Sequence, residues 1–322
     1  MNTLVVGGAG YLGSVLVGVL LENGHRVRVL DNLMHGVSSL LGVWSHPNFE
    51  FIRGDVRDHH TYTSVLRQTD AVIQLAAIVG DPACARQPEL ARAINLHASL
   101  ALLEESRNTG VSRFVFASTC SNYGKMKDPN TFVDETSELR PVSLYAETKV
   151  AVERTLLDST NTGALCATAL RFATIFGVSP RMRFDLTVNE FTMEMLTKKH
   201  LVVFGEQFWR PYVHVRDAAR AIALVLAAPS QKVRNQVFNV GTSEQNYQKQ
   251  QLVELMRSYA TDAVVEYVHK DEDPRDYRVS FAKINKELGF GITRTVQDGI
   301  GEVAHLVQQG VIREFDDPRY RN

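Results

Sequence analysis

The stretch Thr3-Leu4-Val5-Val6-Gly7-Gly8-Ala9-Gly10-Tyr11-Leu12-Gly13 decides the fold of the N-terminal half of this chain. A short apolar run that suits a strand precedes the glycines, and an apolar helix-length segment follows them. Glycines at this spacing permit a tight turn, a close approach of backbone to a pyrophosphate and close helix–strand packing. The helix N-terminus then offers free N–H groups to the phosphates. The stretch therefore predicts a dinucleotide site with Gly7, Gly10, Tyr11, Leu12 and Gly13 as cofactor contacts.

The same region has a second interpretation, because Leu4–Leu21 is nearly uncharged and long enough to resemble a signal or membrane segment. No basic residues precede it, and glycines 7, 8, 10 and 13 interrupt it where a strand would pass into a helix. We therefore expect a strand–turn–helix unit and no membrane association.

The composition is that of an ordinary globular protein. The chain has 322 residues, a formal net charge of −1, 44% hydrophobic and 22% charged residues. This charge gives no general attraction to nucleic acid, so we expect no such partner. Cys84, Cys120 and Cys166 lack CxxC spacing, which favours neither a disulfide framework nor a metal site. A cytoplasmic location is expected.

Outward from the glycines, short β-rich runs alternate with helix-length segments, such as Pro88–Thr109 and Tyr145–Leu157. The runs are apolar without strict alternation, as is typical of strands buried on both faces of a parallel sheet. This order predicts an α/β fold with a doubly wound parallel sheet. The strand candidates are Thr3–Val6, Arg26–Leu30, Phe49–Ile52, Ala71–Leu75, Arg113–Ala117 and Leu165–Arg171.

The pattern changes after about Phe176, where arginines lie in mixed polar segments between short strands and helices. Val237–Val240 resembles one more strand that rejoins the sheet. We predict a large domain over residues 1–175, to which 210–242 partly return, and a smaller lobe over 176–322 threaded back into it. The charged tail Arg313–Asn322 is expected to be loosely ordered.

Asp31 ends the second strand candidate about 20 residues beyond the glycine turn. A carboxylate there accepts hydrogen bonds from ribose hydroxyls and repels a 2′-phosphate, so NAD is favoured over NADP. The alternative is a turn residue that caps the next segment. Further cofactor contacts are expected after the second, third and fourth strands, at Asn32, Asp55, Val56, Leu75, Ala76 and Ala77.

Tyr145 and Lys149 stand one helical turn apart, so both side chains lie on the same face. A nearby ammonium stabilises a phenolate, and we expect it to lower the pKa of Tyr145 so that the phenol exchanges a proton near neutral pH. Thr119 lies at the carboxyl end of the fifth strand, where its hydroxyl suits the reacting oxygen. Alone, each feature has an ordinary alternative: a solvated helix face, or a capped loop.

Taken together, Gly7–Gly13, Asp31, Ser118-Thr119-x-x-x-Tyr123-Gly124 and Tyr145-x-x-x-Lys149 resemble the extended short-chain dehydrogenase/reductase family, which has a Rossmann fold. Pro141-x-x-x-Tyr145 and Arg210-x-Tyr212-Val213-His214-Val215-x-Asp217 resemble its nucleotide-sugar members. The resemblance implies bound NAD, transient removal of a hydride from a sugar carbon and a C-terminal lobe that holds a nucleoside diphosphate. By position it makes Thr119, Tyr145 and Lys149 the catalytic residues.

Differences between this chain and two subfamilies reduce the number of reactions that we expect. Sugar 4,6-dehydratases carry Thr-Asp-Glu where this chain has Thr119-Cys120-Ser121, and nucleotide-sugar decarboxylases typically have a glutamate in place of Ser121. Without these acids we expect a nucleotide-sugar epimerase that acts through a 4-keto intermediate. The alternative is a 4-dehydrogenase or 4-ketoreductase with net redox chemistry.

Longer motifs at 31–34, 76–80, 177–183 and 272–277 resemble enzymes of nucleotide-activated heptoses, including a GDP-heptose 4-dehydrogenase. Heptose and deoxyhexose sugars both stay open. Arginines suit diphosphates because their planar donors bind two oxygens at once. The expected substrate contacts are Val79, Arg181, Asn189, Arg210 and Arg275, whereas His214, set between apolar residues, is expected to be a core residue.

A different class of function is a redox sensor or scaffold that keeps the nucleotide fold without catalysis, but such a protein is expected to lack the Tyr145/Lys149 pair. The resemblance also implies a homodimer in which Pro88–Thr109 and Tyr145–Leu157 form a four-helix interface.

Overall fold

The computed structural model describes residues 1–322 except 127, 129–130, 159–162 and 274, so Pro274 of the 272–277 motif lies outside the described residues. Its centre is a seven-stranded sheet in the order β10-β6-β5-β4-β1-β2-β3, in which every neighbouring pair is parallel. The strands are β1 (Asn2–Val6), β2 (Arg26–Asp31), β3 (Phe49–Arg53), β4 (Ala71–Gln74), β5 (Arg113–Thr119), β6 (Cys166–Phe172) and β10 (Gln236–Val240). The predicted strands are confirmed, including the return of Val237–Val240 to the sheet beside β6.

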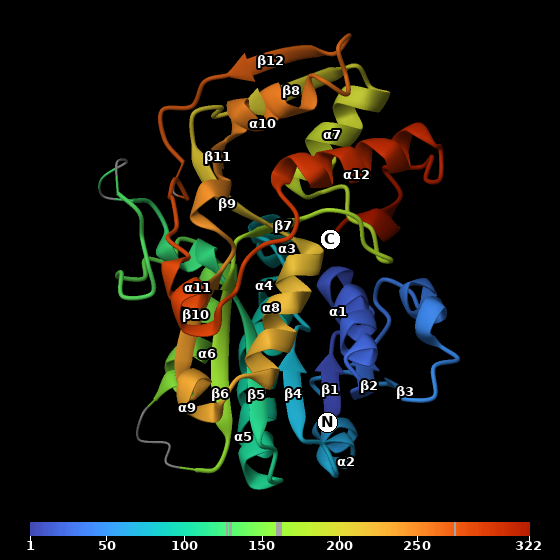
Figure 1. Cartoon of the computed structure of the whole chain (residues 1–322), viewed down its shortest axis with the longest axis vertical. Helices are drawn as coiled ribbons and strands as arrows, with labels where there is room; N and C mark the ends of the chain where they lie inside the picture. Colours follow the sequence, from blue (N-terminus) through green and yellow to red (C-terminus); the bar gives the residue numbers. More distant parts are fainter. Residues whose placement is uncertain (127, 129–130, 159–162, 274) are drawn as a thin grey trace.

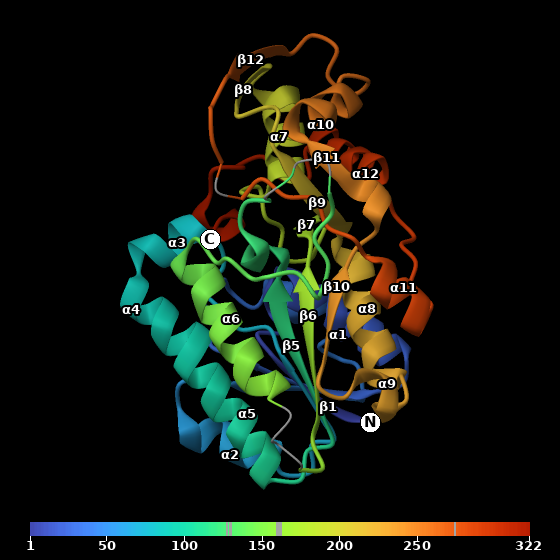
Figure 2. The same cartoon turned by 90° about the vertical axis from the view of Figure 1, so that its left-hand side faces the viewer.

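Two layers of helices enclose this sheet (Figure 2). One face carries α1 (Tyr11–Glu22) and α8 (Val215–Ala227), which pack against each other. The other carries α2 (His59–Leu66), α4 (Pro88–Ala91), α5 (Ser99–Asn108) and α6 (Leu144–Leu157). All residues of β4 and β6 are buried between the layers, which explains why these runs lack polar alternation. The doubly wound α/β fold is therefore confirmed.

Two local expectations are refined by the helices. The segment predicted as one helix over Pro88–Thr109 consists of α4, a π-helical stretch η2 (Arg92–Ala98) and α5. Leu4–Leu21 divides into β1, the glycine turn and α1 rather than forming one apolar helix. Among the described residues, no helix is long and apolar enough to cross a membrane.

A second lobe lies beyond the carboxyl ends of the sheet strands, at the top of Figure 1. It contains a three-stranded sheet β11-β9-β7 and the pair β12-β8, with three longer helices around them. Its elements are β7 (Thr174–Phe176), α7 (Thr187–Thr197), β8 (His200–Phe204), β9 (Trp209–His214), β11 (Asn246–Gln248), α10 (Lys249–Met256), β12 (Val264–Val268) and α12 (Val296–Gln308). Shorter connecting elements are η1 (Ser38–Val43), α3 (Asp81–Arg86), η3 (Cys120–Tyr123), α9 (Ser230–Val233), η4 (Ser243–Gln245), α11 (Ala282–Leu288) and η5 (Pro318–Tyr320). After β9 the chain leaves the second lobe, forms α8 on one face of the central sheet and then adds β10 to the edge of that sheet.

The C-terminal tail is docked, so the expectation that Arg313–Asn322 is loosely ordered is wrong. Phe315 and Tyr320 lie edge-on to the buried ring of Phe184, at centroid distances of 5.1 and 5.9 Å. The backbone N–H of Phe184 also donates to the carbonyl of Tyr320 at 2.9 Å. The prediction gave weight to the charged residues of the tail and overlooked these two aromatic residues. Their burial offsets the entropy lost when a terminus becomes ordered.

We expect removal of residues 313–322 to destabilise the protein, because it exposes Phe184 and deletes two aromatic contacts. The free energy of unfolding, measured with urea, should fall by about 3 kcal/mol or more. The control is Tyr267→Ala on β12, whose side chain is 41% exposed. That change should cost about 0.5 kcal/mol or less. A truncated protein as stable as the full chain would show that the tail is not docked in solution.

Candidate active site

At three glycines of the turn, a side chain would press against neighbouring backbone atoms. Gly7 has φ +87°, and a Cβ there would lie 2.7 Å from the backbone nitrogen of Ala76. A Cβ on Gly13 would overlap the carbonyl oxygen of Gly7, and one on Gly10 would approach that oxygen to 3.3 Å. The chain then enters α1 at Tyr11 and Leu12. This is a cradle of backbone atoms at a helix N-terminus, which fits the pyrophosphate of a dinucleotide.

Asp31 ties the end of β2 to this turn. Its carboxylate accepts hydrogen bonds from the backbone N–H groups of Ala9, at 2.9 Å, and Leu33, at 2.8 Å. Burial raises the pKa of Asp31, and these two donors oppose that rise. Each oxygen keeps a further lone pair for a ribose hydroxyl.

Asn32 and Asp55 lie together at the ends of β2 and β3. The amide of Asn32 donates to Asp55 at 3.4 Å, and Val56 beside them is buried. The guanidinium of Arg57, which sequence reasoning missed, donates two hydrogen bonds to Asp55 at 2.8 and 2.7 Å. The hydrogen bonds from Arg57 are the main reason that the pKa of Asp55 is lowered to about 2. Because Arg57 is occupied in this way, its presence does not by itself argue for a 2′-phosphate.

The segment after β4 is held by a residue that sequence reasoning also missed. Leu75 and Ala76 both donate their backbone N–H groups to the carbonyl of Val6, at 2.9 Å, which brings them and Ala77 beside the glycine turn. The fully buried Asn95 accepts from the N–H of Ile78 at 2.8 Å and donates to its carbonyl at 2.9 Å. Val79, which follows directly, is partly buried. The available signal was an asparagine inside the apolar run Ala93-Ile94-Asn95-Leu96.

The three predicted catalytic residues come from β5 and α6. Ser143 caps α6 by accepting from the N–H of Ala146 at 3.3 Å, which places Tyr145 in the first turn of the helix. The ammonium of Lys149 donates to the carbonyl of Ala117 at 2.8 Å and lies 5.9 Å from the centroid of the Tyr145 ring. Thr119, two residues beyond that carbonyl, ends β5. The structure thus gathers these residues at the carboxyl edge of the sheet.

The electrostatics of the pair differ from the expectation. Burial is the main cause of a raised Tyr145 pKa, and the charge of Asp81 adds to it. The expected lowering by Lys149 is therefore wrong for the protein's own groups. Lys149 is 2% exposed, and burial lowers its own pKa to about 8. Desolvation by the surrounding apolar side chains outweighs the attraction between phenolate and ammonium.

Arg210 and Arg275, both predicted to bind the diphosphate, lie side by side. Arg210 donates to the carboxylate of Asp273 at 2.6 Å and to the carbonyl of Arg275. Arg275 donates to Asp81 at 2.9 Å, and Asp81 also accepts from the hydroxyl of Ser143 at 2.7 Å. This chain of contacts connects the arginines of the second lobe to the start of α6, two residues before Tyr145.

Asn189 and Arg181 lie apart from those arginines in the hydrogen-bond network, next to the glycine turn and the tail. Asn189 is fully buried; it accepts from the N–H of Gly177 at 2.9 Å and donates to the carbonyl of Arg183 at 2.9 Å. Arg181 donates to the carbonyl of Arg321 at 2.9 Å. The phenol of Tyr11 donates to the carbonyl of Gly177 at 2.6 Å. The contact between Tyr11 and Gly177 joins the two lobes, whereas the others lie within the second lobe. A role of Asn189 or Arg181 in substrate binding stays a prediction.

His214 is a core residue, as predicted. It is fully buried, its Nε2 lies 2.9 Å from a carboxylate oxygen of Glu302, and its Nδ1 accepts from the N–H of Arg216 at 3.2 Å. Both ring nitrogens therefore have partners within the protein.

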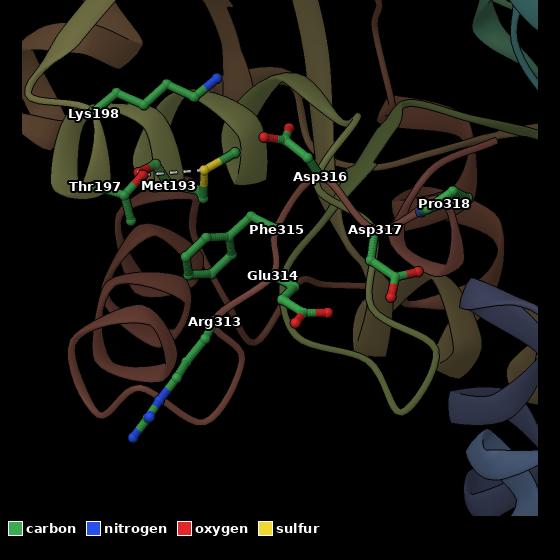
Figure 3. A pocket seen from close by; sticks show the side chains of 9 residues that line it. All are labelled: Met193, Thr197, Lys198, Arg313, Glu314, Phe315, Asp316, Asp317 and Pro318. Carbon is green, nitrogen blue, oxygen red and sulfur yellow. Dashed lines mark hydrogen bonds between the residues drawn. The ribbon is translucent and has the colours of Figure 1, made fainter.

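A depression of about 610 Å³ lies elsewhere, between α7 and the C-terminal tail (Figure 3). Its lining combines Met193, Thr197 and Lys198 with tail residues from Arg313 to Pro318. It includes none of the residues expected to bind cofactor or substrate, so it is separate from the candidate active site.

Comparisons with known proteins agree with this geometry. The NAD dependent epimerase/dehydratase family matches residues 3–241. A UDP-glucose 4-epimerase of Corynebacterium glutamicum is 28% identical over 90% of this chain and 90% of its own, and a dTDP-glucose 4,6-dehydratase of Streptomyces niveus is 29% identical over 94% and 91%. The crystal structure of a Thermotoga maritima UDP-glucose 4-epimerase with UDP-glucose has a TM-score of 0.85 and 29% identity, and the match covers 97% of this chain and 100% of that one.

Gly13→Ala should weaken NAD binding, because the new methyl group has to displace the backbone of Gly7 in the pyrophosphate cradle. Overpacking of this kind costs about 1–3 kcal/mol, so the NAD dissociation constant from calorimetry should rise about 10- to 100-fold. Gly18→Ala is the matched control, since a Cβ at this position of the same helix meets nothing within 4 Å. It should keep NAD affinity and raise stability by about 0.5–1 kcal/mol. Equal affinities in the two variants would contradict the assignment of this turn.

Lys149→Met should stabilise the protein at pH 7, because the folded state holds this ammonium at a cost. The folded pKa of about 8 lies below the ordinary value of 10.5, so the unfolded chain binds more protons between these values. Wild-type stability therefore rises with pH across that window, and the variant should lack the rise. Its gain at pH 7 should be on the order of 2–3 kcal/mol.

Urea unfolding at a series of pH values measures this difference, which should vanish above pH 10.5. Lys198→Met, at a lysine whose side chain is 48% exposed, serves as the control and should give no such gain. A Lys149→Met variant that is less stable than wild type at pH 7 would contradict the lowered pKa.

Proposed function

Because the chain belongs to the NAD dependent epimerase/dehydratase family, we propose that it is a nucleotide-sugar epimerase that acts through a 4-keto intermediate. The observation that carries the proposal is the complete set of Thr119, Tyr145 and Lys149 at one edge of the sheet, beside a backbone cradle for NAD. The similarity to UDP-glucose 4-epimerases over nine-tenths of the chain supports it.

The residues next to Thr119 favour epimerisation over elimination of water, even though a dehydratase is among the relatives. Cys120 is buried, and its thiol donates to the carbonyl of Arg171 at 3.3 Å. Ser121 accepts a hydrogen bond from the phenol of Tyr277 at 3.4 Å. Neither side chain carries a carboxylic acid that could protonate a leaving hydroxyl.

NAD fits the residues at the carboxyl edge of the sheet. The cradle of Gly7, Gly10 and Gly13 admits a pyrophosphate, and Asp31 retains acceptor positions for the ribose while its charge opposes a 2′-phosphate. When bound, NAD supplies the acceptor and later the donor of the hydride.

In the proposed reaction, the oxygen of Tyr145 takes the proton of the sugar 4-hydroxyl as its C4–H bond breaks and the ketone forms. The hydroxyl of Thr119 donates a hydrogen bond to the same sugar oxygen and shares its developing charge. The ammonium of Lys149, anchored on the carbonyl of Ala117, favours the phenolate form of Tyr145. After the ketone turns its other face, the hydride would return to C4 from the opposite side. Tyr145 then gives the proton back to the C4 oxygen, which completes the epimer.

The second lobe, residues 176–322, is proposed to hold the nucleotide, while residues 1–175 and part of 210–242 hold NAD. Arg210 and Arg275 are the best-placed diphosphate ligands, because they lie together and connect through Asp81 to Ser143, the cap of α6. We further propose a cytoplasmic homodimer whose interface involves Pro88–Thr109 and Tyr145–Leu157. The exposed edge of these helices includes Ala101, Glu104 and Glu147.

The test incubates the purified protein with NAD and candidate UDP-, dTDP- and GDP-sugars, and identifies the products by NMR. A 4-epimer should form without net NADH, and Tyr145→Phe should reduce its rate about 10²- to 10⁴-fold. Tyr267→Phe makes the same chemical change at an exposed strand position and should leave the rate unchanged. Accumulation of a ketone with stoichiometric NADH, or full turnover by Tyr145→Phe, would overturn the proposal.

A further inference from the structure

A buried ion pair lies directly behind the predicted catalytic residues. Glu153 of α6 and Arg171 of β6 have side chains only 1% and 4% exposed. The guanidinium donates to the carboxylate from Nε, at 3.1 Å, and from a terminal nitrogen, at 2.7 Å. Arg171 also donates to the phenol oxygen of Tyr123 at 3.0 Å. The proposed reaction uses neither charge.

The pair reaches the end of β5 through two polar side chains. Ser118 donates a short hydrogen bond to Glu153, and Asn122 donates to the same carboxylate at 2.8 Å. Asn122 donates also to the hydroxyl of Ser118 at 3.1 Å. Glu153 therefore fastens Ser118 to α6 between the two neighbours that matter for catalysis, Ala117 and Thr119.

Glu153 also follows Lys149 by one turn on the same helix face. The groups that face the ammonium are the carbonyl of Ala117 and the ring of Phe116 on β5, Tyr145 and Glu153 on α6, and Cys84 on α3. The carboxylate of Glu153 favours the charged form of Lys149, against the effect of burial on its pKa.

We propose that Glu153 is a positioning residue of the active site. Paired with Arg171, it holds the end of β5 against α6, keeps the carbonyl of Ala117 at the ammonium of Lys149 and keeps that ammonium charged. Ser118 is thereby directed to Glu153, which leaves Thr119 as the strand-end hydroxyl for substrate. This inference rests on the role proposed above for Lys149.

A purely structural purpose does not account for the pair. Burying two charges costs several kcal/mol per ion, and apolar residues of similar volume often serve stability as well or better. An ion pair that only held α6 against β6 could stand at any position along the two elements. This one lies on α6 one turn after Lys149, and its carboxylate is hydrogen-bonded to Ser118 at the strand end that carries Thr119.

The experiment measures the pKa of Lys149 directly, by carbon-13 NMR of protein labelled at lysine Cε, with the signal assigned by its loss in Lys149→Met. In Glu153→Gln the pKa should fall by about one unit, because the nearby buried carboxylate is lost. The alkaline limb of the kcat profile should move by the same amount, while KM for the nucleotide sugar should stay unchanged. Glu254→Gln on α10, at a carboxylate whose side chain is 64% exposed, is the control and should move neither.

If Glu153→Gln fails to fold around the unpaired Arg171, the double variant with Arg171→Met removes that cation and should show the same direction of shift. An unchanged Lys149 pKa in a folded variant overturns the inference and leaves the pair a structural element. The NMR readout requires no turnover. A shifted pKa in a protein that epimerises none of the sugars would therefore defeat the proposed function alone, and an unshifted pKa in an active epimerase would defeat this inference alone.

Discussion

Close packing of the glycine turn against the ends of β2 and β4 is the constraint on which the rest of the structure depends. The carbonyl of Val6 accepts from both Leu75 and Ala76, and the N–H of Ala9 is held by Asp31. Only a residue without Cβ fits at Gly7, against the backbone of Ala76. This contact lies at β1, where the next strands along the chain are added first on one side of the sheet, as β2 and β3, and then on the other, as β4 to β6. Ligands of such sheets bind at the point where the strand order reverses. The proposed catalytic side chains of β5 and α6 then reach the same edge because every strand of the sheet is parallel.

What the sequence could predict was local. The glycine spacing, the apolar runs and the Tyr145/Lys149 spacing each lie within a few residues, and the structure confirms the elements that they indicated. Contacts between distant residues left no such signal: Arg275 meets Asp81 across 194 positions, and Arg181 meets Arg321 across 140. The sequence predicted Arg171 only as the last residue of a strand, because no feature of the neighbouring sequence indicated that it pairs with Glu153. The tail was misjudged for the same reason, because its two aromatic residues have meaning only beside Phe184.

The raised pKa of Tyr145 shows where reasoning from spacing stops. A turn of helix brings an ammonium near the phenol, but it does not specify how much water either group loses. Here Phe116 lies against Lys149, and the charge of Asp81 opposes a phenolate at Tyr145. The protein alone therefore disfavours both charged forms of its acid–base pair. Oxidised NAD, when bound, would bring a positively charged ring, and a positive charge favours a nearby phenolate. This arrangement links the acid–base pair to occupancy of the cofactor site.

The same network explains why a carboxylate near the reacting sugar need not make this enzyme a dehydratase. Glu153 lies behind the strand end, but its oxygens are occupied by Arg171, Ser118 and Asn122. A carboxylate engaged by a guanidinium, a hydroxyl and an amide in this way is not free to approach a leaving hydroxyl. At the positions that follow Thr119, where elimination enzymes carry their acids, this chain has a thiol and a hydroxyl. The chemistry that we propose for the edge of the sheet is therefore proton transfer through Tyr145 coupled to hydride transfer, and in this proposal the carboxylate of Glu153 holds the residues of that step in place.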